Sequence, residues 1–135
     1  MSPSIWIGWF ATVSWLPGPV VHAEAGEAAT ASLLAAERPP TAIVYGSDLL
    51  AAAGLAAARS RGIAVPGELS ITGFDDSPLA ALASPPLTSV RIDYAQFGEA
   101  AAATLLAAIA GDPPPPYEAP PPELVVRAST GPASR

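Results

Sequence analysis

Apolar positions along the chain alternate between short β-branched runs and longer stretches rich in alanine and leucine. Residues 23–37 predict a helix, because alanine, leucine and glutamate favour one and its acidic first turn suits the helix dipole. Residues 41–46 form a short apolar run with β-branched side chains, which predicts a buried strand. Ser47 and Asp48 then cap the start of a second helix, and Gly62 marks its end.

The second half of the chain continues this alternation. Residues 69–74 and 87–92 predict two more buried strands, and residues 123–128 predict a last one. Residues 94–110 predict a helix, and the prolines of residues 112–122 predict an extended linker. The apolar stripe of that helix consists of Phe97, Ala101, Leu105 and Ile109. Strands and helices joined by short links predict an α/β fold in which helices cover both faces of a parallel sheet.

Residues 1–19 are apolar but show neither helical spacing nor strict alternation, so we expect an irregular segment there. The apolar run over residues 5–16 is shorter than the roughly 20 residues that span a bilayer. A secretory signal is one interpretation, because residues 22–25 loosely resemble a cleavage site, but no lysine or arginine precedes the run. The alternative is a remnant of a domain that begins further upstream. Apolar packing surface, rather than a binding platform, is expected of Trp6, Trp9 and Trp15.

Composition excludes several kinds of site. The chain of 135 residues is long enough for one domain and has a net charge of −6, with six arginines and no lysine. These arginines are scattered, so we do not expect the chain itself to hold nucleic acid, which needs clustered cations. Without cysteine and with a single histidine, His22, it lacks the ligands of a thiolate or multi-histidine metal site. No nucleotide-binding loop or nucleophile motif is present, and nothing links Ser47 to His22 as a dyad, so neither catalysis nor a cofactor is expected.

Candidate binding chemistry lies where two predicted strands end. Ser47 and Asp48 follow one strand, and Asp75 and Asp76 follow another. Ligands of parallel α/β sheets bind outside the carboxyl ends of the strands, so both pairs are expected at the same edge of the sheet. Carboxylates there suit the vicinal hydroxyls of a sugar or nucleoside. The alternatives are structural: a helix cap for Asp48, and a turn for Asp75 and Asp76.

An ordered series of sequence blocks points to a family. From Pro40 the chain reads Pro-Thr-Ala-Ile, then Ser-Asp, a helix, Gly-Ile-x-Val-Pro-x-Glu-Leu-Ser-Ile-x-Gly-Phe-Asp-Asp, Pro-Pro-Leu-Thr-Ser-Val and Phe-Gly-x-x-Ala. These blocks, with the closing Glu-Leu-Val-Val-Arg-Ala-Ser-Thr-Gly, resemble the C-terminal part of the effector-sensing domain of LacI/GalR-type transcriptional repressors. The resemblance covers residues 20–132, leaving 1–19 as a separate N-terminal segment and 133–135 as a tail.

The resemblance implies a Rossmann-like C-terminal subdomain of a periplasmic-binding-protein-like type I fold, here in incomplete form. In the family, two such subdomains are joined by three crossing segments and clamp a small effector between them. A separate N-terminal helix-turn-helix headpiece binds operator DNA. Neither a headpiece nor a first subdomain precedes Val20, so the resemblance implies a truncated sensor domain that does not bind DNA by itself.

Carried over residue by residue, the resemblance makes Asp75 the carboxylate that binds effector hydroxyls. Ser47 stands where the family often has an effector-binding asparagine, and Asp48 matches the aspartate beside it. The helix from Leu49 and the loop over residues 79–83 match the dimer surface of the family, with an ordinary core role as the alternative for their leucines. The expected dimer residues are Leu49, Ala52, Leu79, Leu82 and Ala83.

The expected function is ligand sensing in a cytoplasmic transcriptional regulator, without catalysis, cofactor or membrane contact. The effector is of the sugar or nucleoside class, and the intact parent is expected to be a homodimer that reaches operator DNA only through its headpiece. One alternative is a periplasmic sugar-binding protein of an ABC-type transporter. Another is a non-functional truncated product, marked by poor solubility and no cooperative unfolding. The family packs the helix over residues 94–110 in the first subdomain, so here its apolar stripe would be exposed.

Overall fold

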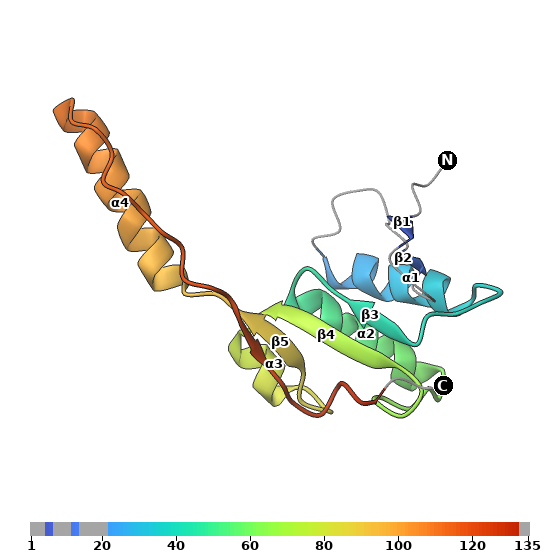
Figure 1. Cartoon of the computed structure of the whole chain (residues 1–135). Coiled ribbons are helices and arrows are strands. Elements are labelled where there is room, and N and C mark those ends of the chain that lie inside the picture. Colours follow the sequence, from blue (N-terminus) through green and yellow to red (C-terminus); the bar gives the residue numbers. More distant parts are fainter. Residues whose placement is uncertain (1–4, 7–11, 14–21, 133–135) are drawn as a thin grey trace.

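A four-stranded sheet forms the centre of the computed structural model, which describes residues 5–6, 12–13 and 22–132 (Figure 1). In spatial order its strands are β3 (Ala42–Val44), β4 (Ser70–Asp75), β5 (Thr88–Arg91) and β6 (Glu123–Val125). Strands β3, β4 and β5 run parallel, whereas β6 is antiparallel to β5. The α/β class with a mainly parallel sheet and flanking helices is therefore confirmed, and the direction of the last strand is the exception.

Three helices lie on one face of this sheet: α1 (Ala23–Leu34), α2 (Asp48–Ser60) and α3 (Pro78–Leu82). Gly26 lets α1 approach α2 closely, since a Cβ at this position would lie 3.0 Å from Leu50 Cδ2. The expectation of helices on both faces is wrong for the described residues, because α1 packs on α2 and not on the opposite face. Ile43 packs in the core with α2, whereas the next residue, Val44, is 76% exposed.

The core between the helices and the sheet depends on a few large side chains. These are Ile43, Tyr45, Leu55, Leu69, Ile71 and Leu87. Buried alanines of α2 and α3 complete the core, and they bury little area but let the helices lie close to the strands. The hydroxyl of Tyr45 lies 2.7 Å from Thr30 Oγ1 of α1, so the buried phenol has a polar partner.

The segment after β6 is held to the sheet through Ser129. Its hydroxyl accepts a hydrogen bond from Thr88 N at 2.8 Å and donates one to the carbonyl of Ile71 at 2.6 Å. The amide of Ile71 in turn donates to the carbonyl of Ser129 at 2.8 Å. The last strand is therefore shorter than the predicted 123–128, and the residues beyond it contact β4 and β5.

Helix α4 (Tyr94–Ala110) is present as predicted and extends away from the sheet (Figure 1). Asp93 caps its start by accepting a hydrogen bond from Gln96 N at 3.0 Å, and Gly111 closes it with a φ of 80°. None of its residues is buried. The predicted apolar stripe is exposed, with Phe97 58% and Ile109 74% accessible.

The proline-rich linker of residues 112–122 runs back beside α4 (Figure 1). Tyr117 meets Phe97 edge to face, with the ring centroids 6.4 Å apart. The linker brings the chain back to the sheet at the end where β5 leaves it, so β6 runs antiparallel to β5.

Two short strands near the N-terminus are described: β1 (Ile5–Trp6) pairs antiparallel with β2 (Thr12–Val13). The rest of the segment 1–19, the tryptophan side chains and the tail 133–135 lie outside the described residues, so what the sequence predicts for them stays a prediction. In the part of the chain that the structure describes, no helix has the length and apolar character needed to cross a bilayer.

Candidate functional site

Polar side chains that follow the three parallel strands meet at one edge of the sheet. Asp48 follows β3, Asp75 ends β4 with Asp76 directly after it, and Arg91 ends β5. The Asp48 carboxylate reaches the turn after β4, where its Oδ2 accepts hydrogen bonds from Ser77 N at 2.6 Å and Ser77 Oγ at 2.8 Å. The two positions that the sequence singles out therefore lie together, as the rule for parallel strands requires.

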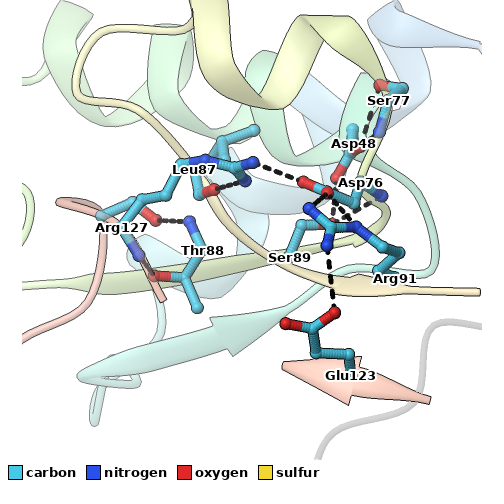
Figure 2. A network of polar contacts seen from close by, with 10 residues as sticks. Asp48, Asp76, Ser77, Leu87, Thr88, Ser89, Arg91, Glu123 and Arg127 are labelled. Carbon is cyan, nitrogen blue, oxygen red and sulfur yellow. Dashed lines mark hydrogen bonds and ion pairs between the residues drawn. The ribbon is translucent and has the colours of Figure 1, made fainter. Parts of the chain in front are cut away.

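Asp48 is a buried tie between α2 and the sheet. Asp48 is only 2% exposed, and its Oδ1 accepts a hydrogen bond from Ser89 Oγ of β5 at 2.6 Å (Figure 2). Gly73 of β4 lies so close to the same oxygen that a Cβ there would collide with it. Ser47 caps α2 as predicted, accepting from Leu50 N at 3.3 Å. Both oxygens of Asp48 thus have protein donors, and its place in an effector site stays a prediction.

Asp75 and Asp76 share an unusual backbone conformation. Their φ angles are 101° and 49°, in a region that residues other than glycine rarely occupy, although aspartate tolerates it better than most. This conformation turns the chain where β4 ends. It directs the two carboxylates to different partners, and strained backbone of this kind persists only where surrounding contacts hold it.

The Asp76 carboxylate is the centre of an ion-pair network (Figure 2). Arg91 approaches Oδ2 with Nε at 2.8 Å and Nη2 at 2.6 Å, while Arg127 Nη2 lies 2.6 Å from Oδ1. Arg91 Nη1 also pairs with Glu123 Oε2 at 3.0 Å. Because the Asp76 side chain is only 4% exposed, this network firmly connects the end of β4 to β5, to β6 and to the segment after β6.

The charge of Asp76 is favoured by its neighbours. Burial acts to raise the pKa of this carboxyl, but the guanidinium groups of Arg127 and Arg91 outweigh it, and the pKa is lowered. Neither arginine was predicted to belong to this site. The available signal was an arginine near the end of each of two predicted strands.

Asp75 has fewer protein partners than Asp76. Its residue is half-buried, and its Oδ1 accepts a hydrogen bond from the hydroxyl of Tyr94 at the start of α4. Among the described residues, Tyr94 is the one hydrogen-bond partner of this carboxylate. Two cavities lie elsewhere, one of about 480 Å³ along α4 and one of about 230 Å³ between α2 and the loop at Ser84, and neither includes Asp75. With one described partner on Oδ1, the Asp75 carboxylate still has acceptor capacity at the edge of the sheet.

Metal binding has little support at this edge. Within the described ranges, no group of three or more histidine, cysteine, aspartate or glutamate side chains could hold a metal ion. The oxygens of Asp48 and Asp76 are already occupied by hydroxyl, amide and guanidinium groups of the protein.

Residues 12–130 match the sequence profile of the periplasmic binding protein-like domain family. The chain belongs to this family. Among curated relatives of this periplasmic binding protein-like domain, the HTH-type transcriptional regulator MalR of Streptomyces coelicolor is 48% identical over 111 residues. That match covers 82% of this chain and 32% of MalR, so the chain spans about a third of the length of this relative.

Solved structures agree with the sequence relatives. A LacI family transcriptional regulator from Bifidobacterium animalis subsp. lactis superposes with a TM-score of 0.77 at 40% identity, over 84% of this chain and 42% of that one. A LacI family regulator from Arthrobacter sp. FB24, solved in complex with lactose, has a TM-score of 0.69 at 31% identity, over 82% and 43% of the two chains. The resemblance to LacI/GalR-type regulators is confirmed, and these relatives are regulators, not enzymes or transport proteins.

The residues expected at the dimer surface of this periplasmic binding protein-like domain lie on or beside α2 and α3, which pack against each other. Leu49 is 47%, Leu79 37% and Leu82 81% exposed, so the alternative of an ordinary core is wrong for these leucines. Ala52 and Ala83 are half-buried, and Ala83 packs partly against the core. The dimer itself stays a prediction.

Proposed function

We propose that this chain is the ligand-sensing part of a LacI/GalR-type transcriptional regulator, and that its effector binds through hydroxyl groups to Asp75. The observation that carries the proposal is the position of the Asp75 carboxylate, half-buried at the carboxyl end of β4. The carboxylates of Asp48 and Asp76, the other two aspartates at this edge, have several protein partners each. Of the three aspartates, Asp75 therefore has the most capacity left for a ligand.

The chemistry of the edge favours a sugar or nucleoside. A carboxylate accepts hydrogen bonds on both oxygens, which matches two neighbouring hydroxyls of such a ligand. Ser47 supports this assignment, because its cap contact with Leu50 N uses only an acceptor site and leaves the hydroxyl proton for a ligand oxygen. The lactose bound to the Arthrobacter regulator supports the sugar class in particular.

The remaining parts of the proposal concern the intact parent. Dimers would form through the exposed leucines on α2 and α3, and operator DNA would be bound by a separate headpiece in the cytoplasm. Effector binding would shift the population between two states of the parent, in proportion to its differential affinity for them. Exposure of Leu49 and Leu82 supports the dimer surface, since apolar side chains of this size gain from being covered.

The test is to titrate the whole chain with lactose and then with a set of other mono- and disaccharides and ribonucleosides. NMR chemical shifts of the protein report binding at each step. A hydrogen bond to a charged group contributes roughly 1.5–3 kcal/mol, so Asp75→Asn is expected to weaken binding by about tenfold or more. Asparagine tolerates the left-handed backbone at this position, so the turn should persist. Asp112→Asn, an exposed aspartate beyond the far end of α4, is the matched control and should bind like the wild type. Equal binding by Asp75→Asn and the wild type would contradict the proposal.

A further inference from the structure

The Asp75 carboxylate already holds a hydroxyl group that belongs to the protein. The phenol of Tyr94 donates a hydrogen bond to Asp75 Oδ1. Tyr94 is 52% exposed, so burial in a core does not account for its position. Its hydroxyl has one described partner, and that partner is the carboxylate proposed to bind the effector.

Two ordered elements bring the pair together. The register of β4 and β5 sets Asp75 beside Arg91, and Tyr94 comes three residues later. The amide of Tyr94 donates to the carbonyl of Ile92 at 3.0 Å, which folds the chain back at this point. Asp93 caps α4 directly before Tyr94, so the first turn of the helix fixes where the ring begins. The contact thus follows from strand register and helix capping rather than from a loose surface side chain.

The left-handed backbone of Asp75 helps to place its carboxylate beside Tyr94. With a φ of 101°, Asp75 directs its carboxylate toward Tyr94 while Asp76 faces the arginines. Asp76 is held by Arg91 and Arg127, so the turn does not depend on the Tyr94 contact for its shape. Tyr94 can therefore leave Asp75 without the edge of the sheet coming apart.

A phenol hydroxyl on a carboxylate has the same donor and acceptor chemistry as a sugar hydroxyl on a carboxylate. We propose that Tyr94 is a specificity-determining residue of the effector site: its hydroxyl occupies Oδ1 of Asp75 in the ligand-free protein, and an effector hydroxyl takes that place. This proposal rests on the proposed function of Asp75. It selects ligands with hydroxyl donors, because a ligand offering only acceptors cannot replace the bond that Tyr94 makes. The exchange also releases the start of α4 from the end of β4.

The first experiment needs no ligand. The charged Asp75 carboxylate accepts a hydrogen bond from the Tyr94 phenol and thereby raises the pKa of Tyr94. The chain is labelled with ¹³C at tyrosine Cζ and titrated by NMR, and the Tyr94 signal is identified by its absence in Tyr94→Phe. We expect Tyr94 to ionise at a higher pH in the wild type than in Asp75→Asn. The same titration curve in both proteins would overturn the proposal.

The second experiment measures lactose binding, or binding of whichever probe of the set above binds the wild type. Tyr94→Phe removes the competing hydroxyl and keeps the ring, so it should bind the probe more tightly by about tenfold or more, as expected when one competing hydrogen bond to a charged group is lost. Tyr117→Phe removes a hydroxyl that makes no described hydrogen bond to Asp75 and should bind like the wild type. Equal or weaker binding by Tyr94→Phe would contradict the competition.

The outcomes separate the two proposals. Binding that survives in Asp75→Asn contradicts the proposed function. Binding that is lost in Asp75→Asn but unchanged in Tyr94→Phe contradicts only the role of Tyr94. If no probe binds any of the proteins, the proposed function fails and the competition fails with it, while the tyrosine titration still decides whether Tyr94 holds Asp75.

Discussion

Helices α2 and α4 show how differently two helices of one chain can be supported. Both have an N-cap side chain, Ser47 for α2 and Asp93 for α4, and α4 is the longer of the two. Yet α2 buries six of its residues against α1, α3 and β4, whereas α4 buries none. Helix formation therefore follows from local capping and composition in both cases, but only α2 contributes to the core. Substitutions on α2 and the sheet should affect stability far more than equivalent substitutions on α4.

Truncating one leucine in each region should give the largest difference. Leu69 is 1% exposed, and Leu69→Ala should lower the free energy of unfolding by about 2–5 kcal/mol through lost burial and the cavity it leaves. Leu105 on α4 is 61% exposed, and Leu105→Ala should stay within about 0.5 kcal/mol of the wild type. Urea denaturation followed by circular dichroism measures both. Similar losses in the two variants would show that α4 is packed in solution.

Replacing one glycine by alanine in each region should change the stability of the chain in opposite directions. A Cβ at Gly73 would collide with Asp48 Oδ1, so Gly73→Ala should destabilise the chain by roughly 1–3 kcal/mol. Nothing lies within 4 Å of a Cβ at Gly98, in α4, and Gly98→Ala should strengthen the helix by about 0.5–1 kcal/mol. Thermal unfolding and helix content report the two effects. A stable Gly73→Ala protein would mean that Asp48 is less tightly held than the structure shows.

The Asp76 network should make the sheet region sensitive to acid. The arginines lower the pKa of the Asp76 carboxyl although burial acts to raise it. The folded chain therefore binds a proton at Asp76 less well than the unfolded chain does. The stabilisation is therefore present above the unfolded pKa of about 4 and is lost as the pH falls through the lower folded value.

Asp76→Asn should cost about 1–2 kcal/mol at pH 7, since Arg91 is half exposed and water screens part of the attraction. The cost should shrink toward pH 3, which urea denaturation across that range measures. Asp112→Asn serves as the control and should leave the stability at pH 7 unchanged. A cost for Asp76→Asn that does not vary with pH would argue against an ionic role.

Features set by neighbouring residues were predictable from the sequence. The cap at Ser47 and the left-handed glycines that follow α2 and α4 (Gly62 at φ 71° and Gly111 at 80°) depend on a few adjacent residues, and each was placed correctly. The short helix α3 was missed, although Pro78 stands at its first position, where proline is favoured.

Features set by distant partners were not predictable. Asp76 meets Arg127 only because the β5–β6 register brings the C-terminal segment beside β4, and no local pattern encodes that register. The packing of α1 on α2, which leaves one face of the sheet without a described helix, likewise depends on the contact of Gly26 with Leu50. In the candidate site, the position of Asp75 at the end of β4 followed from the predicted strand, whereas its contact with Tyr94 was not predicted.

The pairing of β5 with β6 has a topological consequence. Arg91 and Glu123 are register partners, so everything between them leaves the sheet and returns to neighbouring positions. Helix α4 and the proline-rich linker thus form a long connection between two paired antiparallel strands, β5 and β6. A short hairpin turn between the same strands would keep the strand order of the sheet. A two-residue turn of the Asn-Gly type connects antiparallel strands of this kind. The sheet and the helices α1 to α3 packed on it therefore need neither α4 nor the proline-rich linker to connect their strands in this order.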